Sequence, residues 1–84
     1  MEVANNNLIF VIDDDDAFRR TMVFLLEDLE WRVEAFASAA DFLKAYPQPV
    51  LEAGCILLDI RMPLMSGMEL QLKLNELGWL TPII

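Results

Sequence analysis

The sequence contains no histidine, only one cysteine and only three glycines. A zinc site built from cysteine and histidine and an internal disulfide are therefore both excluded. The glycines are scattered, so none of them forms the G-x-G-x-x-G pattern that follows the first strand of dinucleotide-binding folds. No apolar run approaches the roughly 18 residues that a membrane span needs. The opening residues, MEVANNN, have neither the basic nor the apolar region of a signal peptide.

Basic residues are also few, with six Lys and Arg against fourteen Asp and Glu and a formal net charge of −8. Such a surface repels the phosphates of nucleic acids and of anionic lipids, so we expect this chain to bind neither nucleic acid nor membrane. Hydrophobic residues make up 56% of the 84 positions, which is too many for a disordered tail and enough for one small domain. We therefore expect a folded, acidic, cytoplasmic protein.

Short apolar runs alternate with amphipathic stretches along the chain, which is typical of βαβ units on a parallel sheet. The expected strands cover residues 8–12, 31–36 and 55–58, and the expected helices cover residues 16–29, 39–46 and 67–77. Ser66 is suited to begin the last helix and Gly78 to end it. Residues 81–84 then predict the opening of a fourth strand. The predicted fold class is α/β, a doubly wound parallel sheet.

Two of the expected buried strands end in carboxylates, because Asp13 and Asp14 follow the first and Asp59 follows the third. Ligands of open parallel sheets bind beyond the carboxyl ends of the strands, so these side chains converge if the two strands are neighbours. Clustered carboxylates need a counter-charge, and oxygen ligands suit Mg²⁺ better than zinc. A bound metal also neutralises an incoming phosphate and leaves one carboxylate free as a nucleophile. The spacing therefore predicts a Mg²⁺-assisted aspartyl-phosphate site.

A plainer interpretation of the same acids is available. A run of four aspartates, residues 13–16, is by itself typical of a solvated helix start that Asp15 or Asp16 caps. A single aspartate after a strand, such as Asp59, is most often a turn residue. The coincidence of both features, each after a fully apolar run, favours the metal site.

Two segments carry a family resemblance, VIDDD at residues 11–15 and LLDIRMPLMSG at residues 57–67. Together they resemble the receiver domain of bacterial two-component response regulators, most of all receivers that precede a LuxR-type DNA-binding domain. The resemblance covers essentially the whole chain. It implies the flavodoxin-like form of the doubly wound sheet, with strand order 2-1-3-4-5, which places the first and third strands side by side.

The resemblance also implies roles for individual residues. Asp59 matches the aspartate that accepts a phosphoryl group from a sensor histidine kinase. Asp13 and Asp14 match the acidic pair that holds Mg²⁺, and Arg61 matches the residue whose backbone carbonyl is a third protein ligand. Met62, Pro63 and Gly67 match the turn that shapes this loop. Phosphorylation would then switch an output, the regulation of transcription, in the full-length protein, and the chain itself is not expected to be an enzyme.

The sequence departs from the family where it stops. Receivers also use a Ser or Thr after the fourth strand and a Lys after the fifth, and this sequence has neither position. We therefore interpret residues 1–84 as a receiver domain truncated after the start of the fourth strand, with no output domain. An apolar edge at residues 81–84 predicts association, so we expect a homodimer formed by edge pairing or by exchange of elements between two copies.

Two other functions remain open at this point. A truncated receiver could serve only as a non-signalling folding or dimerisation fragment, with no phosphoryl chemistry. Asp13 and Asp15 after an apolar strand also resemble the motif of haloacid-dehalogenase-type phosphohydrolases, in which Asp13 would be the nucleophile. That enzyme has later lysine and acidic motifs for which the sequence has no room, and it leaves the stretch from Asp59 to Pro63 unexplained.

Overall fold

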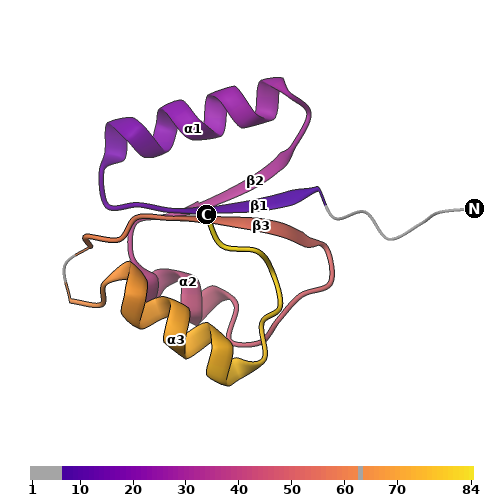
Figure 1. Ribbon diagram of the computed structural model, residues 1–84. Helices are drawn as coiled ribbons and strands as arrows, with labels where there is room; N and C mark the ends of the chain where they lie inside the picture. Colours follow the sequence, from indigo (N-terminus) through magenta and orange to yellow (C-terminus); the bar gives the residue numbers. More distant parts are fainter. Residues whose placement is uncertain (1–6, 63) are drawn as a thin grey trace, which may run out of the picture.

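A computed structural model describes residues 7–62 and 64–84 of the protein. The strands are β1 (Leu8–Ile12), β2 (Arg32–Phe36) and β3 (Ala53–Leu58), and the helices are α1 (Asp16–Asp28), α2 (Ala39–Ala45) and α3 (Gly67–Leu77). The three strands form one parallel sheet in the order β2-β1-β3. In Figure 1, α1 lies on one face of this sheet, and α2 and α3 lie on the other. The predicted α/β fold and the predicted neighbourhood of the first and third strands are confirmed.

The helix ends follow local signals in the sequence. Ser66 precedes α3, and its side chain accepts a hydrogen bond from the backbone N–H of Glu69, whose carboxylate in turn accepts one from the N–H of Ser66. This reciprocal pair satisfies two donors that a helix start leaves unpaired. Gly78 ends the helix with φ of 89°, a left-handed conformation that glycine adopts without a steric penalty.

The predicted start of a fourth strand is present as a short parallel contact with β3. Ile83 forms a single bridge with Ile56, on the side of β3 opposite β1. Three backbone hydrogen bonds support it: Ile56 N donates to Pro82 O at 2.9 Å, Ile84 N donates to Ile56 O at 2.9 Å, and Leu58 N donates to Ile84 O at 3.1 Å. Within the described part of the chain, β3 is therefore paired along both edges, whereas β2 lies at the edge of the sheet.

The hydrophobic core lies between the sheet and the pair α2 and α3. Phe10, Phe42, Ile56, Leu70 and Leu74 are fully buried there. The rings of Phe10 and Phe42 meet edge to face, with centroids 5.1 Å apart, a favourable geometry for aromatic pairs. Burial of both large rings against leucine and isoleucine side chains fixes α2 and α3 on this face of the sheet.

The α1 face is packed less completely. Helical spacing in the sequence predicts an apolar stripe along α1, but no α1 side chain is buried, and Phe18, Leu25 and Leu29 are 50%, 49% and 68% exposed. Met22 and Leu26 are half-buried. Among the described elements α1 alone covers this face, so the stripe contacts the sheet along only part of its width. None of the helices in the described residues has the length and apolar content needed to cross a bilayer.

Candidate metal centre

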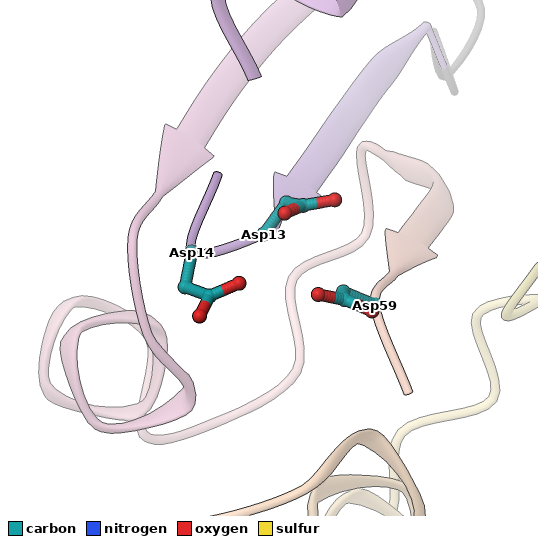
Figure 2. Close-up of side chains that lie close together, drawn as sticks. All are labelled: Asp13, Asp14 and Asp59. Atoms are coloured by element: carbon teal, nitrogen blue, oxygen red, sulfur yellow. The ribbon is translucent and has the colours of Figure 1, made fainter. Parts of the chain in front are cut away.

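Three carboxylates meet at the carboxyl ends of β1 and β3. Asp13, Asp14 and Asp59 each offer an oxygen atom that lies within 4.8 Å of the other two. Figure 2 shows Asp13 directly after the β1 arrow and Asp59 directly after the β3 arrow. The two strands are hydrogen-bonded neighbours whose last residues, Ile12 and Leu58, are paired, so the chain leaves both at the same level. The convergence that the sequence predicted is therefore present.

Two of the four consecutive aspartates belong to the carboxylate cluster, and the other two lie at the start of α1. Asp15 is the N-cap of α1, because its Oδ1 accepts hydrogen bonds from the N–H groups of Ala17 and Phe18 at 3.0 and 3.1 Å. Asp16 forms an ion pair with Arg19 on the next turn. The plainer interpretation thus holds for Asp15 and Asp16, and it leaves Asp13 and Asp14 available to the site.

Hydrogen bonds hold the backbone and one oxygen of Asp13. Its N–H donates to the carbonyl of Phe36 at the end of β2, at 3.1 Å. Its Oδ1 accepts from the N–H of Asp15 at 2.8 Å, and its carbonyl oxygen accepts from Nη1 of Arg19 at 2.6 Å. Arg19 therefore supports the loop through the Asp13 backbone, a role that sequence reasoning missed because it depends on how α1 folds back over the strand end.

Asp59 is held by its own loop and by the start of α3. Its N–H donates to the carbonyl of Ile12 at 3.0 Å, and its Oδ1 accepts from the N–H of Arg61 at 3.1 Å. Gly67, the first residue of α3, packs so closely that a Cβ there would lie 2.5 Å from the Asp59 carbonyl oxygen and 2.8 Å from the Ile60 Cα. Glycine is therefore the residue that permits this approach. The predicted role of Met62 in the same turn fits its burial, and Pro63 lies outside the described residues.

Asp13 is affected both by its burial and by the neighbouring carboxylates. Partial burial raises the pKa of Asp13 above its ordinary value, and repulsion from Asp59 and Asp14 raises it further, against the lowering effect of the hydrogen bond from Asp15. Within residues 7–62 and 64–84 the one ion pair is Arg19 with Asp16, so no basic side chain is paired with the three carboxylates. A divalent cation bound between them would supply the missing charge.

The carboxylates line an open cavity of about 330 Å³, together with Asp15, Phe18 and Arg61. The family resemblance implied that Arg61 is a ligand through its backbone carbonyl, and Arg61 lines the same cavity as the cluster. An adjoining cavity of about 450 Å³ runs from Asp13 and Asp59 toward apolar side chains that include Met22 and Leu57. The carboxylates thus lie beside a cavity that is lined largely by apolar side chains.

Comparison with known proteins decides the family. Residues 9–84 match the response regulator receiver domain. The chain belongs to this receiver domain family. Among curated relatives, the chain is 44% identical over 78 residues to the response regulator protein TmoT of Ectopseudomonas mendocina, covering 93% of the chain and 34% of TmoT. It is 49% identical over 70 residues to the transcriptional regulatory protein FixJ of Azorhizobium caulinodans, covering 83% of the chain and 32% of that FixJ.

Solved structures agree with this assignment. The receiver domain superimposes on full-length FixJ from B. japonicum with a TM-score of 0.82 and 38% identity, over 94% of the chain and 38% of that protein. It superimposes on FixJ-N with a TM-score of 0.79 and 29% identity, over 99% of the chain and 62% of FixJ-N. The chain spans about a third of the length of the curated relatives named above. Membership in this family favours neither the phosphohydrolase alternative nor a fragment without a signalling role.

Proposed function

We propose that this receiver domain accepts a phosphoryl group on Asp59 from a sensor histidine kinase, with Mg²⁺ bound at Asp13, Asp14, Asp59 and the backbone carbonyl of Arg61. The observation that carries the proposal is the cluster itself. Three carboxylates from the ends of two neighbouring strands lie within 4.8 Å of one another in a chain of the receiver family. The same acids would otherwise repel one another without compensation.

The residues fit a hard divalent cation. All the proposed ligands are oxygen atoms, and the open cavity leaves room for the waters that Mg²⁺ retains. Zinc is disfavoured by the donor set, because no histidine exists in the chain and Cys55 lies on β3 away from the cluster. When bound, the cation would neutralise the negative charge of the incoming phosphoryl group beside these carboxylates.

The chain's own residues supply the nucleophile and its orientation. The hydrogen bond from the N–H of Arg61 to Oδ1 of Asp59 fixes the rotation of this carboxylate. A carboxylate oxygen of Asp59 would attack the phosphorus of a phosphohistidine, the P–N bond would break, and the histidine nitrogen would keep the bonding electrons and take a proton from water. Asp13 and Asp14 would hold the cation and would form no bond to the phosphorus.

The partners and the output follow from the same proposal. Relatives include the transcriptional regulatory protein TdiR of Thauera aromatica, 39% identical over 83 residues, so we propose an output in transcription. The donor would be a sensor histidine kinase, and the setting would be the cytoplasm. The strongly acidic chain is not proposed to contact nucleic acid itself. The predicted homodimer remains part of the proposal, although Ile83 pairs with Ile56 of the same chain.

The test is the intact mass of the protein after incubation with a small phosphodonor, with and without Mg²⁺. We expect a gain of one phosphoryl group that requires Mg²⁺ and is lost in Asp59→Asn. Asp41→Asn is the matched control, because Asp41 is an exposed aspartate in the first turn of α2 and is not one of the clustered carboxylates. An equal phosphoryl gain in Asp59→Asn would contradict the proposal. No gain in a folded wild-type protein would contradict it as well, and would leave the non-signalling alternative.

A further inference from the structure

Arg19 joins α1 to the backbone between two of the proposed metal ligands. Its Nη1 donates to the carbonyl oxygen of Asp13 at 2.6 Å, and its Nη2 forms the ion pair with Asp16. The Arg19 side chain is only 17% exposed. Because the guanidinium is planar and its N–H donors point in fixed directions, two acceptors on two of its nitrogens leave it little freedom. The Asp13 carbonyl is therefore held from the side of the helix.

The hydrogen bond from Arg19 acts on the peptide between Asp13 and Asp14. The carbonyl of Asp13 and the N–H of Asp14 belong to one planar unit, so holding the carbonyl fixes the direction in which the chain enters Asp14. Successive side chains of an extended chain point to opposite faces, but here the chain bends at Asp14. Both carboxylates bring an oxygen within 4.8 Å of one from Asp59, and Figure 2 shows both side chains on the short stretch directly after β1. The orientation of this one peptide thus decides whether both acids reach the same ion.

The position of Asp14 depends on this peptide in particular. One carboxylate oxygen of Asp13 accepts a hydrogen bond from the N–H of Asp15, and one of Asp59 accepts from the N–H of Arg61. Asp14, in contrast, is exposed. The place of its carboxylate therefore follows from the backbone that carries it.

We propose that Arg19 is a positioning residue for the cation, and that it sets the affinity for Mg²⁺ by fixing the peptide between Asp13 and Asp14. This inference rests on the proposed function, because it concerns the same Mg²⁺ site. Arg19 lines neither of the two cavities beside the carboxylates, but a separate groove on the flank of α1 that includes Val23. It therefore acts through the Asp13 backbone and does not contact the ion.

Charge and geometry predict opposite results when Arg19 is replaced. A positive side chain near the cluster repels a cation, so the loss of its charge would by itself strengthen Mg²⁺ binding. The loss of its hydrogen bond frees the peptide and would weaken Mg²⁺ binding, as the removal of a residue that orients a metal ligand usually does. The sign of the change therefore distinguishes the two roles.

Calorimetric titration with Mg²⁺ measures this sign. Arg19→Gln should weaken Mg²⁺ binding about tenfold. Arg20→Gln is the matched control, because it removes the same charge from the next position of the same helix, where the side chain is exposed. It should leave the affinity unchanged or raise it by at most about twofold, because solvent and salt screen the charge of an exposed side chain.

A second variant keeps the charge of Arg19 and removes its geometry. Arg19→Lys carries one nitrogen in place of the two that reach Asp13 and Asp16, so it should weaken Mg²⁺ binding about threefold, whereas an effect of charge alone predicts no change. Far-ultraviolet circular dichroism verifies that each variant is folded. If Arg19→Gln does not fold, Arg19→Lys supplies the test.

Two further measurements separate positioning from a general effect on stability. Relaxation of the ¹⁵N nucleus of Asp14 reports the motion of the peptide itself, and the order parameter of this amide should fall in metal-free Arg19→Gln but not in Arg20→Gln. With a small phosphodonor, the Mg²⁺ concentration that gives half the maximal rate of phosphoryl gain should rise about tenfold in Arg19→Gln, in step with the weaker binding. The rate at saturating Mg²⁺ should stay close to that of the wild type, because the N–H of Arg61 orients Asp59.

Three outcomes would overturn the inference while the proposed function stands, because the wild-type protein binds Mg²⁺ in each. The first is an Arg19→Gln protein that binds Mg²⁺ as tightly as the wild type or more tightly, which would leave Arg19 as an ion-pair partner of Asp16 alone. The second is an equal loss of affinity in Arg20→Gln, which would assign the effect to the helix as a whole. The third is an unchanged order parameter at Asp14. A folded wild-type protein that binds no Mg²⁺ would overturn the proposed function and this inference with it.

Discussion

Gly67 shows how one residue without a side chain can position a functional one. Its Cα lies against the backbone of Asp59 and Ile60, where a methyl group would come within 2.5 Å of a carbonyl oxygen. Its N–H also donates to the carbonyl of Ile60 at 3.0 Å. The first turn of α3 is thereby attached to the loop that carries the proposed phosphoacceptor. The backbone at Asp59 cannot move away from Asp13 without disturbing that attachment.

We therefore predict that Gly67→Ala lowers the free energy of unfolding by about 2–4 kcal/mol and also weakens Mg²⁺ binding, because the Asp59 backbone must shift to admit the methyl group. Urea unfolding followed by the tryptophan emission, to which Trp31 and Trp79 both contribute, measures the first effect, and calorimetric titration with Mg²⁺ measures the second. Gly78→Ala is the control. It strains a left-handed residue at a cost of about 1–2 kcal/mol, but nothing lies within 4 Å of the added carbon, so Mg²⁺ affinity should not change. Equal Mg²⁺ affinity in Gly67→Ala and wild type would refute this role.

Tyr46 joins α2 to β2 through a single side chain. Its hydroxyl donates to both carboxylate oxygens of Glu34, at 2.7 Å each. This hydrogen bond, followed by partial burial and the negative charge of Glu34, raises the pKa of Tyr46 to about 12. Because the folded-state pKa lies above the ordinary value of 10.0, the stabilisation is fully present below about pH 10 and is lost as the pH rises toward 12.

The chain contains one tyrosine, so the absorbance of tyrosinate reports Tyr46 alone. We predict that the native protein titrates with a midpoint near pH 12 and that Glu34→Gln moves the midpoint back toward 10, because the substitution removes the negative charge beside the phenolate. Glu76→Gln, at an exposed position of α3, should leave the titration midpoint of Tyr46 unchanged. Circular dichroism at each pH identifies the folded range. A wild-type midpoint near 10 in folded protein would contradict the geometry of this pair.

At the scale of elements, what could be predicted from the sequence depended on how local the signal was. Ser66 and Gly78 predicted both ends of α3, because capping involves residues within one turn of the helix. The apolar runs predicted β1 and β3, and the acids after each predicted the cluster, because neighbouring parallel strands present their carboxyl ends at one edge. The strands and the ends of α3 required only the local pattern, whereas the cluster also required β1 and β3 to be neighbours, which the resemblance to receiver domains implied.

The features that were not predicted depend on residues brought together from different elements. The exposure of Phe18 and Leu25 on α1 is set by how much of the sheet lies beneath the helix, which the spacing of apolar residues does not encode. The bond between Tyr46 and Glu34 joins two elements whose relative position follows from the packing of Phe42 and Phe36. Gly67 was identified from its place in a motif, and its physical reason, the approach to Asp59, became visible only in three dimensions.

At the scale of the whole molecule, the net charge of −8 is distributed unevenly. The three clustered carboxylates stand close together at one end of the sheet. Since the folded-state pKa of Asp13 is raised above 3.8, the ionised form of this residue is less favourable in the folded protein than in the unfolded chain. Asp13 therefore lowers the stability of the metal-free protein when the pH lies above its folded-state pKa, and this cost disappears as the pH falls below about 3.8.

Two opposite effects of one substitution follow from this balance. Without metal at pH 7, Asp13→Asn should raise the thermal midpoint by about 2–5 °C, because the amide oxygen can still accept the hydrogen bond from Asp15, while the burial of a charge and its repulsion by the other carboxylates are both removed. With Mg²⁺ at a hundredfold excess over its dissociation constant, the wild-type protein should gain about 2.7 kcal/mol, whereas Asp13→Asn should gain much less. Asp41→Asn, in the first turn of α2, should keep the full Mg²⁺ effect. Differential scanning calorimetry with and without Mg²⁺ measures all of these changes. An Asp13→Asn protein that is less stable than wild type without metal, and that Mg²⁺ still stabilises fully, would show that Asp13 belongs to the structure of the loop and not to a cation site.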